Sequence, residues 1–345
     1  MDALAYEKQF LDHLAPVWRE LPLDVRGDFL VDPSLVERAR SLGIDPLPIP
    51  RPLVDRGRPI APSGQTRRPA LVASYGDTKE ARRLGYGPLA YLEHGIGQSY
   101  GKTGPRANGS YSGGTDRDDT GLFLVPGEDP AARWRAAYPR ARVEIVGSPR
   151  LDDLPRREDG PRPVVAISFH WPVPVGISGY AGTAIADHQR SLPEIAKRYQ
   201  VIGHAHPKGD WPERARRVFA RAGIPFVDDF DEVCRRADLY VCDNSSTIFE
   251  FAATGRPVVL LNAGTWSRQG PEFGLRFWRA SHVGINVGPG ELTTDVIARA
   301  LEDPEDVALD REDALSLVYK YRDHGASRAA SVLVDWLADV SEMAA

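Results

Sequence analysis

Apolar and polar positions alternate most regularly between residues 237 and 262. Two four-residue apolar runs, 239–242 and 258–261, are typical of buried parallel strands. Between them, the segment 243–247 (Asp-Asn-Ser-Ser-Thr) is rich in helix-capping residues, and 248–252 has an apolar face suited to a helix. The pattern therefore predicts a strand, a helix and a second strand, with hydroxyl groups gathered where the helix begins.

The rest of the second half continues this alternation and predicts a mostly parallel sheet covered on both faces. The expected strands are 164–168, 201–203, 226–227 and 283–287, and the expected helices are 184–198, 212–222, 231–236, 293–301 and 326–340.

The first half is less regular. Residues 1–45 carry apolar residues at helical spacing and predict a largely helical segment that Pro16 kinks or divides. Residues 46–69 are rich in proline and arginine, which indicates a loop or extended connection. Further on, strands are expected at 70–74, 89–93, 122–125 and 143–146, with helices at 77–84 and 130–138.

A charged, proline-rich run at 155–163 divides the chain. Because 345 residues exceed one typical core, we expect two α/β domains. The first spans 1–154 and includes the helical N-terminal extension. The second spans 163–325, and a terminal helix over 326–345 can cross back to the first.

Charge, hydropathy and cysteine spacing indicate which partners and which compartment to expect. The net charge of -5 argues against general nucleic-acid binding. No apolar run reaches the ~18 residues of a membrane span and no signal peptide opens the chain, so we expect a cytoplasmic protein with no indicated membrane association. Cys234 and Cys242 lack metal-site spacing and predict buried thiols in a reducing compartment.

Candidate chemistry follows the predicted strands. Ligand sites in open parallel sheets lie beyond the carboxyl ends of the strands. His94, His170, His206 and Ser245 each follow a predicted strand, so they can converge on one cleft between two domains. A helix N-terminus with hydroxyls suits a phosphate. A histidine that titrates near neutrality can serve as a base.

These groups match a transfer reaction from a nucleotide diphosphate to a hydroxyl. Such a transfer needs a base for the acceptor and positive charge or hydrogen-bond donors for the leaving phosphate. We expect His94 to be the base, with Glu93 as the rival carboxylate. Lys208 and Arg268 are further cations for the phosphates, and His170 is a candidate donor contact. His204 is equally well explained as structural, and His13 as a surface or packing residue.

No metal, cofactor or Walker motif is expected. The acidic segment 116–119 is better explained as a solvated loop than as a metal site. The segment 95–101 (Gly-Ile-Gly-Gln-Ser-Tyr-Gly) resembles a phosphate loop but lacks the Lys-Ser/Thr ending. The long stretch that follows it predicts a lid or binding loop. Trp266, Phe277 and Trp278 could stack a base or sugar, although packing is the commoner role.

Several scattered motifs, taken in order, resemble the CDP-glycerol glycerophosphotransferase family of teichoic-acid polymerases and primases. They are His94-Gly95, Gly147-Ser-Pro-Arg-Leu-Asp152, His206-Pro207, Asp243-Asn-Ser-Ser-Thr-Ile-Phe-Glu-Phe-Ala252 and Asp323-His-Gly-Ala-Ser-Arg328. The resemblance covers about residues 70–340. It implies the GT-B fold, in which two Rossmann-like domains with parallel sheets face a central cleft.

The same resemblance implies roles for individual residues. His94 would be the general base, and His206, Ser245 and Ser246 would hold the donor pyrophosphate. Asn244 and Thr247, in the same motif, join the donor-binding set. The chain departs from the family after His94-Gly95, where Ile96-Gly-Gln-Ser-Tyr-Gly101 replaces Thr-Pro-Leu-Lys, and at Asn244, where a tyrosine is common.

The sequence thus predicts a metal-independent transferase that moves glycerophosphate from a CDP-glycerol-like donor to a hydroxyl of a polyol, sugar or glycan. A GT-B glycosyltransferase using a nucleotide-sugar, and a nucleotide-sugar 2-epimerase, are alternatives on the same fold. A non-catalytic nucleotide-binding protein is the alternative of another class.

Overall fold

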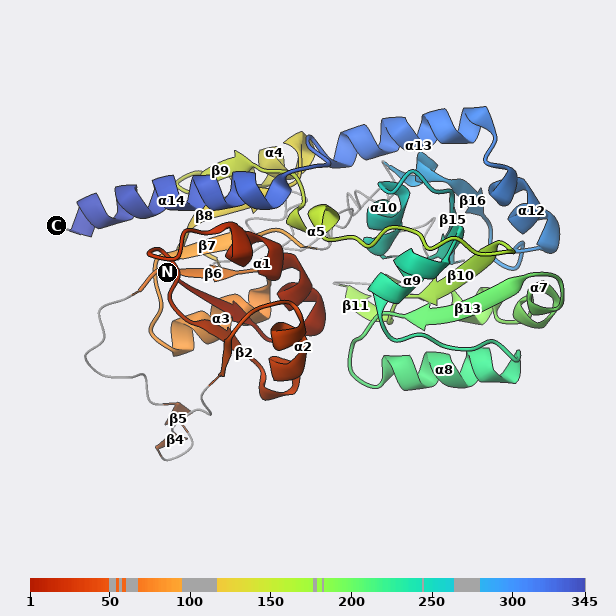
Figure 1. Ribbon diagram of the computed structural model, residues 1–345, viewed down its shortest axis with the longest axis horizontal. Helices are drawn as coiled ribbons and strands as arrows, with labels where there is room; N and C mark the ends of the chain where they lie inside the picture. The colour runs from red at the N-terminus through yellow and green to blue at the C-terminus, as the bar shows by residue number, and fades with distance from the viewer. Residues whose placement is uncertain are drawn as a thin grey trace. The chain divides into compact units, whose positions relative to one another are not determined.

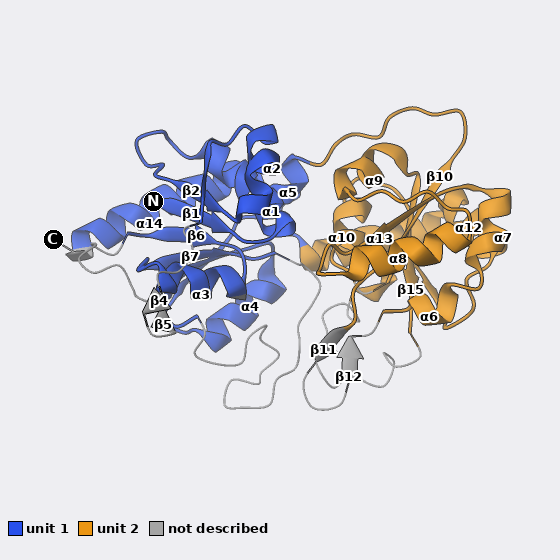
Figure 2. Ribbon diagram, turned by 90° about the horizontal axis from the view of Figure 1, so that it is seen from below, with its two compact units in different colours: residues 1–94, 114–153, 319–345 blue, residues 95–113, 154–318 orange. Residues whose placement is uncertain are grey.

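The structure, a computed structural model, describes residues 1–49, 54–55, 58–59, 68–94, 117–175, 179–181, 183–243, 245–263 and 280–344. The chain divides into two compact units, coloured separately in Figure 2. Unit 1 comprises residues 1–94, 114–153 and 319–345, and unit 2 comprises residues 95–113 and 154–318. The domains predicted from the sequence were 1–154 and 163–325, with a terminal helix over 326–345 that can cross back to the first. In the structure residues 319–345 group with unit 1, as that crossing implies, whereas residues 95–113 group with unit 2.

Among the described residues, the sheet of unit 1 has seven parallel strands in the order β3-β2-β1-β6-β7-β8-β9. Figure 1 labels β2, β6, β7, β8 and β9 of this sheet. They are β1 (Asp2–Ala5), β2 (Phe29–Val31), β3 (Pro46–Pro48), β6 (Ala70–Val72), β7 (Leu89–Leu92), β8 (Thr120–Val125) and β9 (Arg142–Ile145). A small antiparallel pair, β4 (Val54–Asp55) and β5 (Arg58–Pro59), stands apart from this sheet.

Helices cover both faces of this sheet. The described helical segments are α1 (Lys8–Glu20), the 3₁₀ turn η1 (Pro33–Leu35), α2 (Val36–Ser41), α3 (Tyr75–Arg83), α4 (Glu128–Ala137), α5 (Pro149–Asp152) and α14 (Gly325–Ala344). Apolar side chains of α1, α2 and α14 share one core with the sheet, including Leu11, Leu14, Ala39, Leu333 and Trp336. The rings of Trp134 in α4 and of Tyr138, the residue that follows α4, pack with Phe123 of β8.

The structure of the first 48 residues differs from the predicted helical extension. They hold α1 and α2, but they also supply β1, β2 and β3, so they form part of the sheet and are not a helical extension. These strands are only three or four residues long, too short to show an alternating pattern beside a strongly amphipathic helix. Pro16 lies inside α1 without dividing it.

In unit 2 the described sheet has five parallel strands in the order β13-β10-β14-β15-β16. The strands of unit 2 are β10 (Val164–Phe169), β13 (Gln200–Ala205), β14 (Leu239–Cys242), β15 (Val258–Leu261), β16 (Ile285–Val287) and the antiparallel pair β11 (Val173–Val175) and β12 (Gly179–Ala181). The helical segments are α6 (Ile185–His188), α7 (Leu192–Arg198), α8 (Trp211–Arg221), α9 (Phe230–Arg236), α10 (Thr247–Ala252), the 3₁₀ turn η4 (Ser281–Val283), α12 (Thr294–Glu302) and α13 (Glu305–Val318).

Packing explains why these elements meet as they do. Ile195 of α7, Phe219 of α8 and Ile297 of α12 share a core with the sheet of unit 2. Gly203 in β13 permits the close approach of α8, because a Cβ there would stand 2.5 Å from the Phe219 ring. The helix predicted over 184–198 is wrong in one respect, since the structure breaks it into α6 and α7. The strand predicted at 226–227 is reduced to a single bridge between Gly203 and Phe226.

The predicted fold class is confirmed in that an α/β chain forms two parallel sheets. Both cysteines are buried and unpaired by disulfide, as their spacing predicted. Among the helices that the structure describes, none is both long and apolar enough to cross a membrane.

Candidate functional site

The carboxyl ends of β10, β13 and β14 in unit 2 carry most of the predicted donor-binding residues. His170 follows β10, the segment from His206 to Lys208 follows β13, and Ser245 follows β14. Parallel strands end at the same edge of a sheet, so these residues gather there. Asn244, Arg268, Trp266, Phe277, Trp278, Asp116 and the loop 95–101 lie outside the described residues.

Asp243 joins two of these strand ends. Its carboxylate accepts hydrogen bonds from the backbone N–H of His170 at 2.6 Å and of Ala184 at 2.8 Å. Its own carbonyl accepts from the N–H of Ser245 at 2.7 Å. The side chain is completely buried, and burial raises the pKa of this carboxyl to about 7 against the lowering effect of its hydrogen bonds. These hydrogen bonds of Asp243 therefore fix the backbone positions of His170 and Ser245.

Two imidazoles meet at this edge. The rings of His170 and His206 are 4.5 Å apart between centroids and packed edge to face. His170 is buried, and Trp171 O lies 2.8 Å from its Nδ1. Burial lowers the pKa of His170 to about 4, so its ring is neutral at pH 7. With Nδ1–H donating to the carbonyl, the Nε2 of His170 is left as a hydrogen-bond acceptor.

The two serines differ in their surroundings. The buried Ser245 hydroxyl lies 2.8 Å from Thr247 Oγ1, which lies 2.9 Å from the hydroxyl of Tyr240. Ser245 thus belongs to an internal chain of hydroxyls. Ser246 is half-buried and precedes α10, but its side chain makes no capping hydrogen bond. Of the two, Ser246 is the better placed to bind a ligand.

Two more residues complete this edge, His204 in β13 and Lys208 in the segment that follows it. Lys208 is half-buried in the turn before α8 and hydrogen-bonds through its N–H to the carbonyl of His206. His204 is buried within the strand, with its Nδ1 2.9 Å from the Ser168 hydroxyl. This contact agrees with the structural role that the sequence left open for His204.

In unit 1, His94 follows β7 and rests against α1. Its ring centroid is 4.4 Å from that of Phe10 and 6.3 Å from that of His13. Nδ1 of the imidazole is buried with no partner among the described residues. Burial is the main reason that the pKa of His94 falls to about 4. His13 proves to be a packing residue, since its side chain is buried.

Glu93, the rival base, is held differently. Its side chain is buried, and its Oε2 accepts a hydrogen bond from the indole N–H of Trp134 at 3.0 Å. The guanidinium of Arg117 lies 4.9 Å above the Tyr91 ring and 5.4 Å above that of Trp134. Glu93 therefore sits among the aromatic side chains that α4 and β7 bury.

A further buried carboxylate of unit 1, Asp77, had not been expected. Asp77 lies in the first turn of α3 and is completely buried. Its Oδ1 accepts from the N–H of Tyr6 at 3.1 Å, whereas Oδ2 has no partner among the described residues. Burial raises the pKa of this carboxyl to about 7. The spacing of Ser74 and Asp77 is that of a capping box, so a local signal for this carboxylate existed in the sequence.

Two motifs of the resemblance have a structural role in unit 1. Asp152 accepts a hydrogen bond from the N–H of Ala326 at 2.7 Å, at the start of α14. Gly147 has φ +82°, and a Cβ there would meet the carbonyl of Tyr321 at 2.6 Å. The segments 147–152 and 323–328 therefore hold α14 in place.

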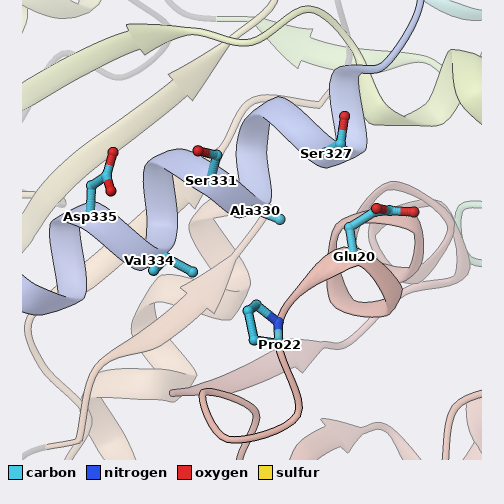
Figure 3. A pocket seen from close by; sticks show the side chains of 7 residues that line it. All are labelled: Glu20, Pro22, Ser327, Ala330, Ser331, Val334 and Asp335. Atoms are coloured by element: carbon cyan, nitrogen blue, oxygen red, sulfur yellow. The ribbon is translucent and has the colours of Figure 1, made fainter.

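A surface hollow of about 310 Å³ lies beside α14 and the end of α1 (Figure 3). It is lined by Glu20, Pro22, Ser327, Ala330, Ser331, Val334 and Asp335. Glu20 is ten residues along α1 from Phe10, or about 15 Å at the rise of an α-helix. The hollow is thus separate from the surroundings of His94. Within the described part of the chain, no cluster of three or more His, Cys, Asp or Glu residues could hold a metal ion.

Sequence reasoning missed Asp243 and His13 as neighbours of the candidate residues. Asp243 was noted only as a capping residue, and its bonds to His170 and Ala184 span 73 and 59 residues of sequence. His13 lies 81 positions before His94. A single sequence carries no signal for pairs so far apart.

No protein-family model matches the chain, and no curated protein does. Solved structures do match over nearly its whole length. UDP-GlcNAc 2-epimerase from Neisseria meningitidis, bound to UDP-GlcNAc, is 13% identical with a TM-score of 0.56, covering 98% of this chain and 100% of that one. The S. aureus MnaA–UDP co-structure is 12% identical with a TM-score of 0.63, covering 99% and 96%.

The wall teichoic acid polymerase TagF also matches. One of its structures is 12% identical with a TM-score of 0.62, covering 99% of this chain and 89% of that one. Another, soaked with CDPG, is 11% identical with a TM-score of 0.58. Identities this low show a shared architecture. Together with the two parallel sheets, they show that the chain has the GT-B fold.

Proposed function

We propose that the chain is a GT-B enzyme that binds a nucleotide-diphosphate donor at the carboxyl edge of the unit 2 sheet and transfers a glycerophosphate group to a hydroxyl acceptor. The observation that carries the proposal is the gathering of His170, His206 and the two serines at three neighbouring strand ends, tied by Asp243. The neighbours' own ligands, UDP-GlcNAc, UDP and CDPG, favour a nucleotide diphosphate.

Different side chains at this edge suit different parts of the donor. Ser246 and Lys208 supply hydrogen-bond donors and positive charge for phosphate oxygens. Neutral His170 offers an acceptor at Nε2, which suits a hydroxyl of the donor better than a phosphate oxygen. Because α10 has only six residues, these side chains and not the helix end carry the phosphate-binding argument.

The chemical step places His94 as the base. In glycerophosphate transfer the acceptor oxygen bonds to the phosphorus that carries the glycerol, and the bond from that phosphorus to the bridging oxygen breaks. CMP leaves, and the hydroxyl proton passes to His94. A base of this kind contributes roughly 10²–10⁴-fold in rate. At a pKa of about 4, His94 is unprotonated at neutral pH but accepts a proton less readily than an imidazole that titrates near 6.5, so the base role rests on its place after β7.

The nucleotide product tests the proposal and separates its rivals. The full chain is incubated with CDP-glycerol, UDP-sugars and GDP-sugars, and thermal shift identifies the donor that binds. A ligand at 100 times its Kd stabilises the native state by about 2.7 kcal/mol. Turnover then yields CMP for glycerophosphate transfer, a nucleoside diphosphate for glycosyl transfer, or an epimerised nucleotide-sugar with no nucleotide released.

Glycosyl transfer and 2-epimerisation remain candidates because epimerase structures match the fold. A donor that binds and never turns over with any acceptor would favour a binding protein. Ser246→Ala is expected to weaken donor binding, with Ser331→Ala, on the exposed face of α14, as the matched control. The absence of CMP from CDP-glycerol under conditions where another donor reacts would overturn glycerophosphate transfer.

A further inference from the structure

We propose that Trp171 is a donor-binding residue whose indole ring stacks on the nucleobase of the donor. The inference rests on the proposed donor site of unit 2, and it adds a residue that was not among the candidates from the sequence. The aromatic residues that the sequence offered for stacking, Trp266, Phe277 and Trp278, lie outside the described residues.

Trp171 stands at the carboxyl edge of the unit 2 sheet, two residues beyond the end of β10. Its ring centroid lies 6.3 Å from that of His206 and 6.1 Å from that of His170, whose plane is inclined to it by 29°. The rings of the two histidines are themselves 4.5 Å apart. Three aromatic rings from two neighbouring strand ends therefore gather where the donor is proposed to bind.

The backbone around Trp171 is fixed by hydrogen bonds. The N–H of His170 donates to the Asp243 carboxylate, and the ring Nδ1–H of His170 donates to the carbonyl of Trp171 at 2.8 Å. Pro172 follows, and a proline disfavours a helical backbone at the residue before it. A side chain on a backbone that is already ordered loses less conformational freedom when a ligand binds, which favours affinity.

A second tryptophan near the end of β10 shows how a structural indole is held. Trp211 is buried, and its indole N–H donates to the carbonyl of Phe169 at 2.9 Å, as is usual for a buried tryptophan. Trp171 is only half-buried. Part of it packs against the core of unit 2, and its indole N–H makes no hydrogen bond among the described residues. The ring of Trp171 is thus accessible to a ligand in a way that the ring of Trp211 is not.

The chemistry of these rings suits a base better than a phosphate. An indole is uncharged, and the ring of His170 is neutral at pH 7 because burial lowers its pKa to about 4. Ser246 and Lys208 supply the hydrogen-bond donors and the positive charge that phosphate oxygens require. The nucleobase is the flat aromatic part of any nucleotide-diphosphate donor, and every base has a π-face that can stack. We therefore expect Trp171 to strengthen nucleotide binding without choosing among bases.

The test measures the Kd of CDP, UDP, GDP and inorganic pyrophosphate by calorimetry, with the full chain and two variants. Trp171→Phe keeps a ring that can stack, whereas Trp171→Leu keeps an apolar side chain against the core but has no π-face. Trp171→Leu should weaken nucleotide binding about 5- to 150-fold, which equals about 1–3 kcal/mol at 1.4 kcal/mol per factor of ten. Trp171→Phe should keep most of the affinity, and pyrophosphate should bind equally well to all three proteins.

Fluorescence identifies the ring that stacks. The chain has seven tryptophans, so the signal of Trp171 is obtained as the difference between the wild type and Trp171→Phe. A saturating concentration of the nucleotide that binds most tightly should lower the indole emission of the wild type, because a stacked base quenches it. The emission of Trp171→Phe should fall much less. An equal fall in both proteins would overturn the proposal.

The outcomes separate this inference from the function on which it rests. Equal nucleotide affinity in Trp171→Leu and Trp171→Phe would show that the ring only packs, and turnover of the donor would still support the proposed function. A loss of pyrophosphate affinity in Trp171→Leu as large as the loss of nucleotide affinity would also refute stacking on the base.

Two further outcomes concern the function itself. A chain that binds none of the three nucleotides would contradict both the donor site and the stacking role. Nucleotide binding that depends on the ring of Trp171, without formation of CMP from CDP-glycerol, would refute glycerophosphate transfer and support the stacking role.

Discussion

Replacing Asp77 by asparagine should change the stability of the protein in opposite directions at low and high pH. The carboxyl is completely buried, and burial raises its pKa from 3.8 to about 7. Between these two values the folded protein holds a proton that the unfolded chain has released. Stability is therefore lost as pH rises through this window, and the full penalty is present above pH 7.

The size of this loss of stability follows from the change in the pKa of Asp77. About three pKa units at 1.36 kcal/mol each cost the wild-type protein on the order of 4 kcal/mol above pH 7. Asparagine avoids this cost and can keep the bond to the N–H of Tyr6 through its own oxygen. Its NH₂ group takes the place of Oδ2, which has no partner among the described residues, at a cost of about 1–3 kcal/mol.

Asp77→Asn should therefore be more stable than the wild type at pH 8 by about 1–3 kcal/mol, and less stable at pH 4 by a similar amount. Thermal unfolding at both pH values measures the difference. A swing of about 4 kcal/mol corresponds to roughly 8–16 °C in Tm at 2–4 °C per kcal/mol. A difference in Tm that is independent of pH would refute the reasoning.

Asp243 provides the matched control. It is equally buried, and its pKa is also raised to about 7, but both of its oxygens accept backbone hydrogen bonds. An asparagine there would turn its NH₂ towards the N–H of His170 or of Ala184. Asp243→Asn should consequently destabilise the protein at pH 8 as well as at pH 4, and a gain in stability at pH 8 would contradict this account of the hydrogen bonds.

Three further predictions concern single positions. Ser245→Ala should lower Tm by breaking the hydroxyl chain to Tyr240 while donor affinity, measured by calorimetry, falls less than in Ser246→Ala; the reverse order would exchange their roles. Gly203→Ala should destabilise unit 2 by about 1–3 kcal/mol in a denaturant titration, because its Cβ would meet the Phe219 ring, and an unchanged midpoint would show that α8 can shift. Glu93→Gln should retain more turnover than His94→Gln with the same donor, since glutamine can still accept a hydrogen bond from Trp134. An equal loss of turnover in both variants would leave the base unassigned between Glu93 and His94.

The sequence predicted unit 2 better than unit 1, for physical reasons. Strands β10 and β14 are buried along their whole length, so they appear as continuous apolar runs between polar turns. Strands β1 to β3 are short and lie beside α1, whose helical periodicity dominates the first 45 residues. Helix α13 was not predicted at all, because polar and apolar residues are spread around it without a clear apolar face.

The candidate site shows the same division. Residues that follow strands could be named from local pattern, as His170 and His206 were, because the edge of a parallel sheet collects whatever follows each strand. The residues that bond to these histidines or pack against them could not be named from local pattern. The bond from Asp243 to His170 and the packing of Phe10 on His94 depend on contacts between distant segments, which only the folded chain brings together.

The division of unit 1 into separated segments has a consequence for biosynthesis. Helix α14 supplies Ala329, Leu333 and Trp336 to the core that α1 shares with β1, yet the ribosome makes it after every strand of both sheets. Domains usually fold in the order in which they emerge. Here unit 2 can bury its core first, while the apolar face of α1 stays exposed until α14 has been synthesised. A nascent chain arrested near residue 318 should therefore bind chaperones through its N-terminal unit, although that unit emerged first.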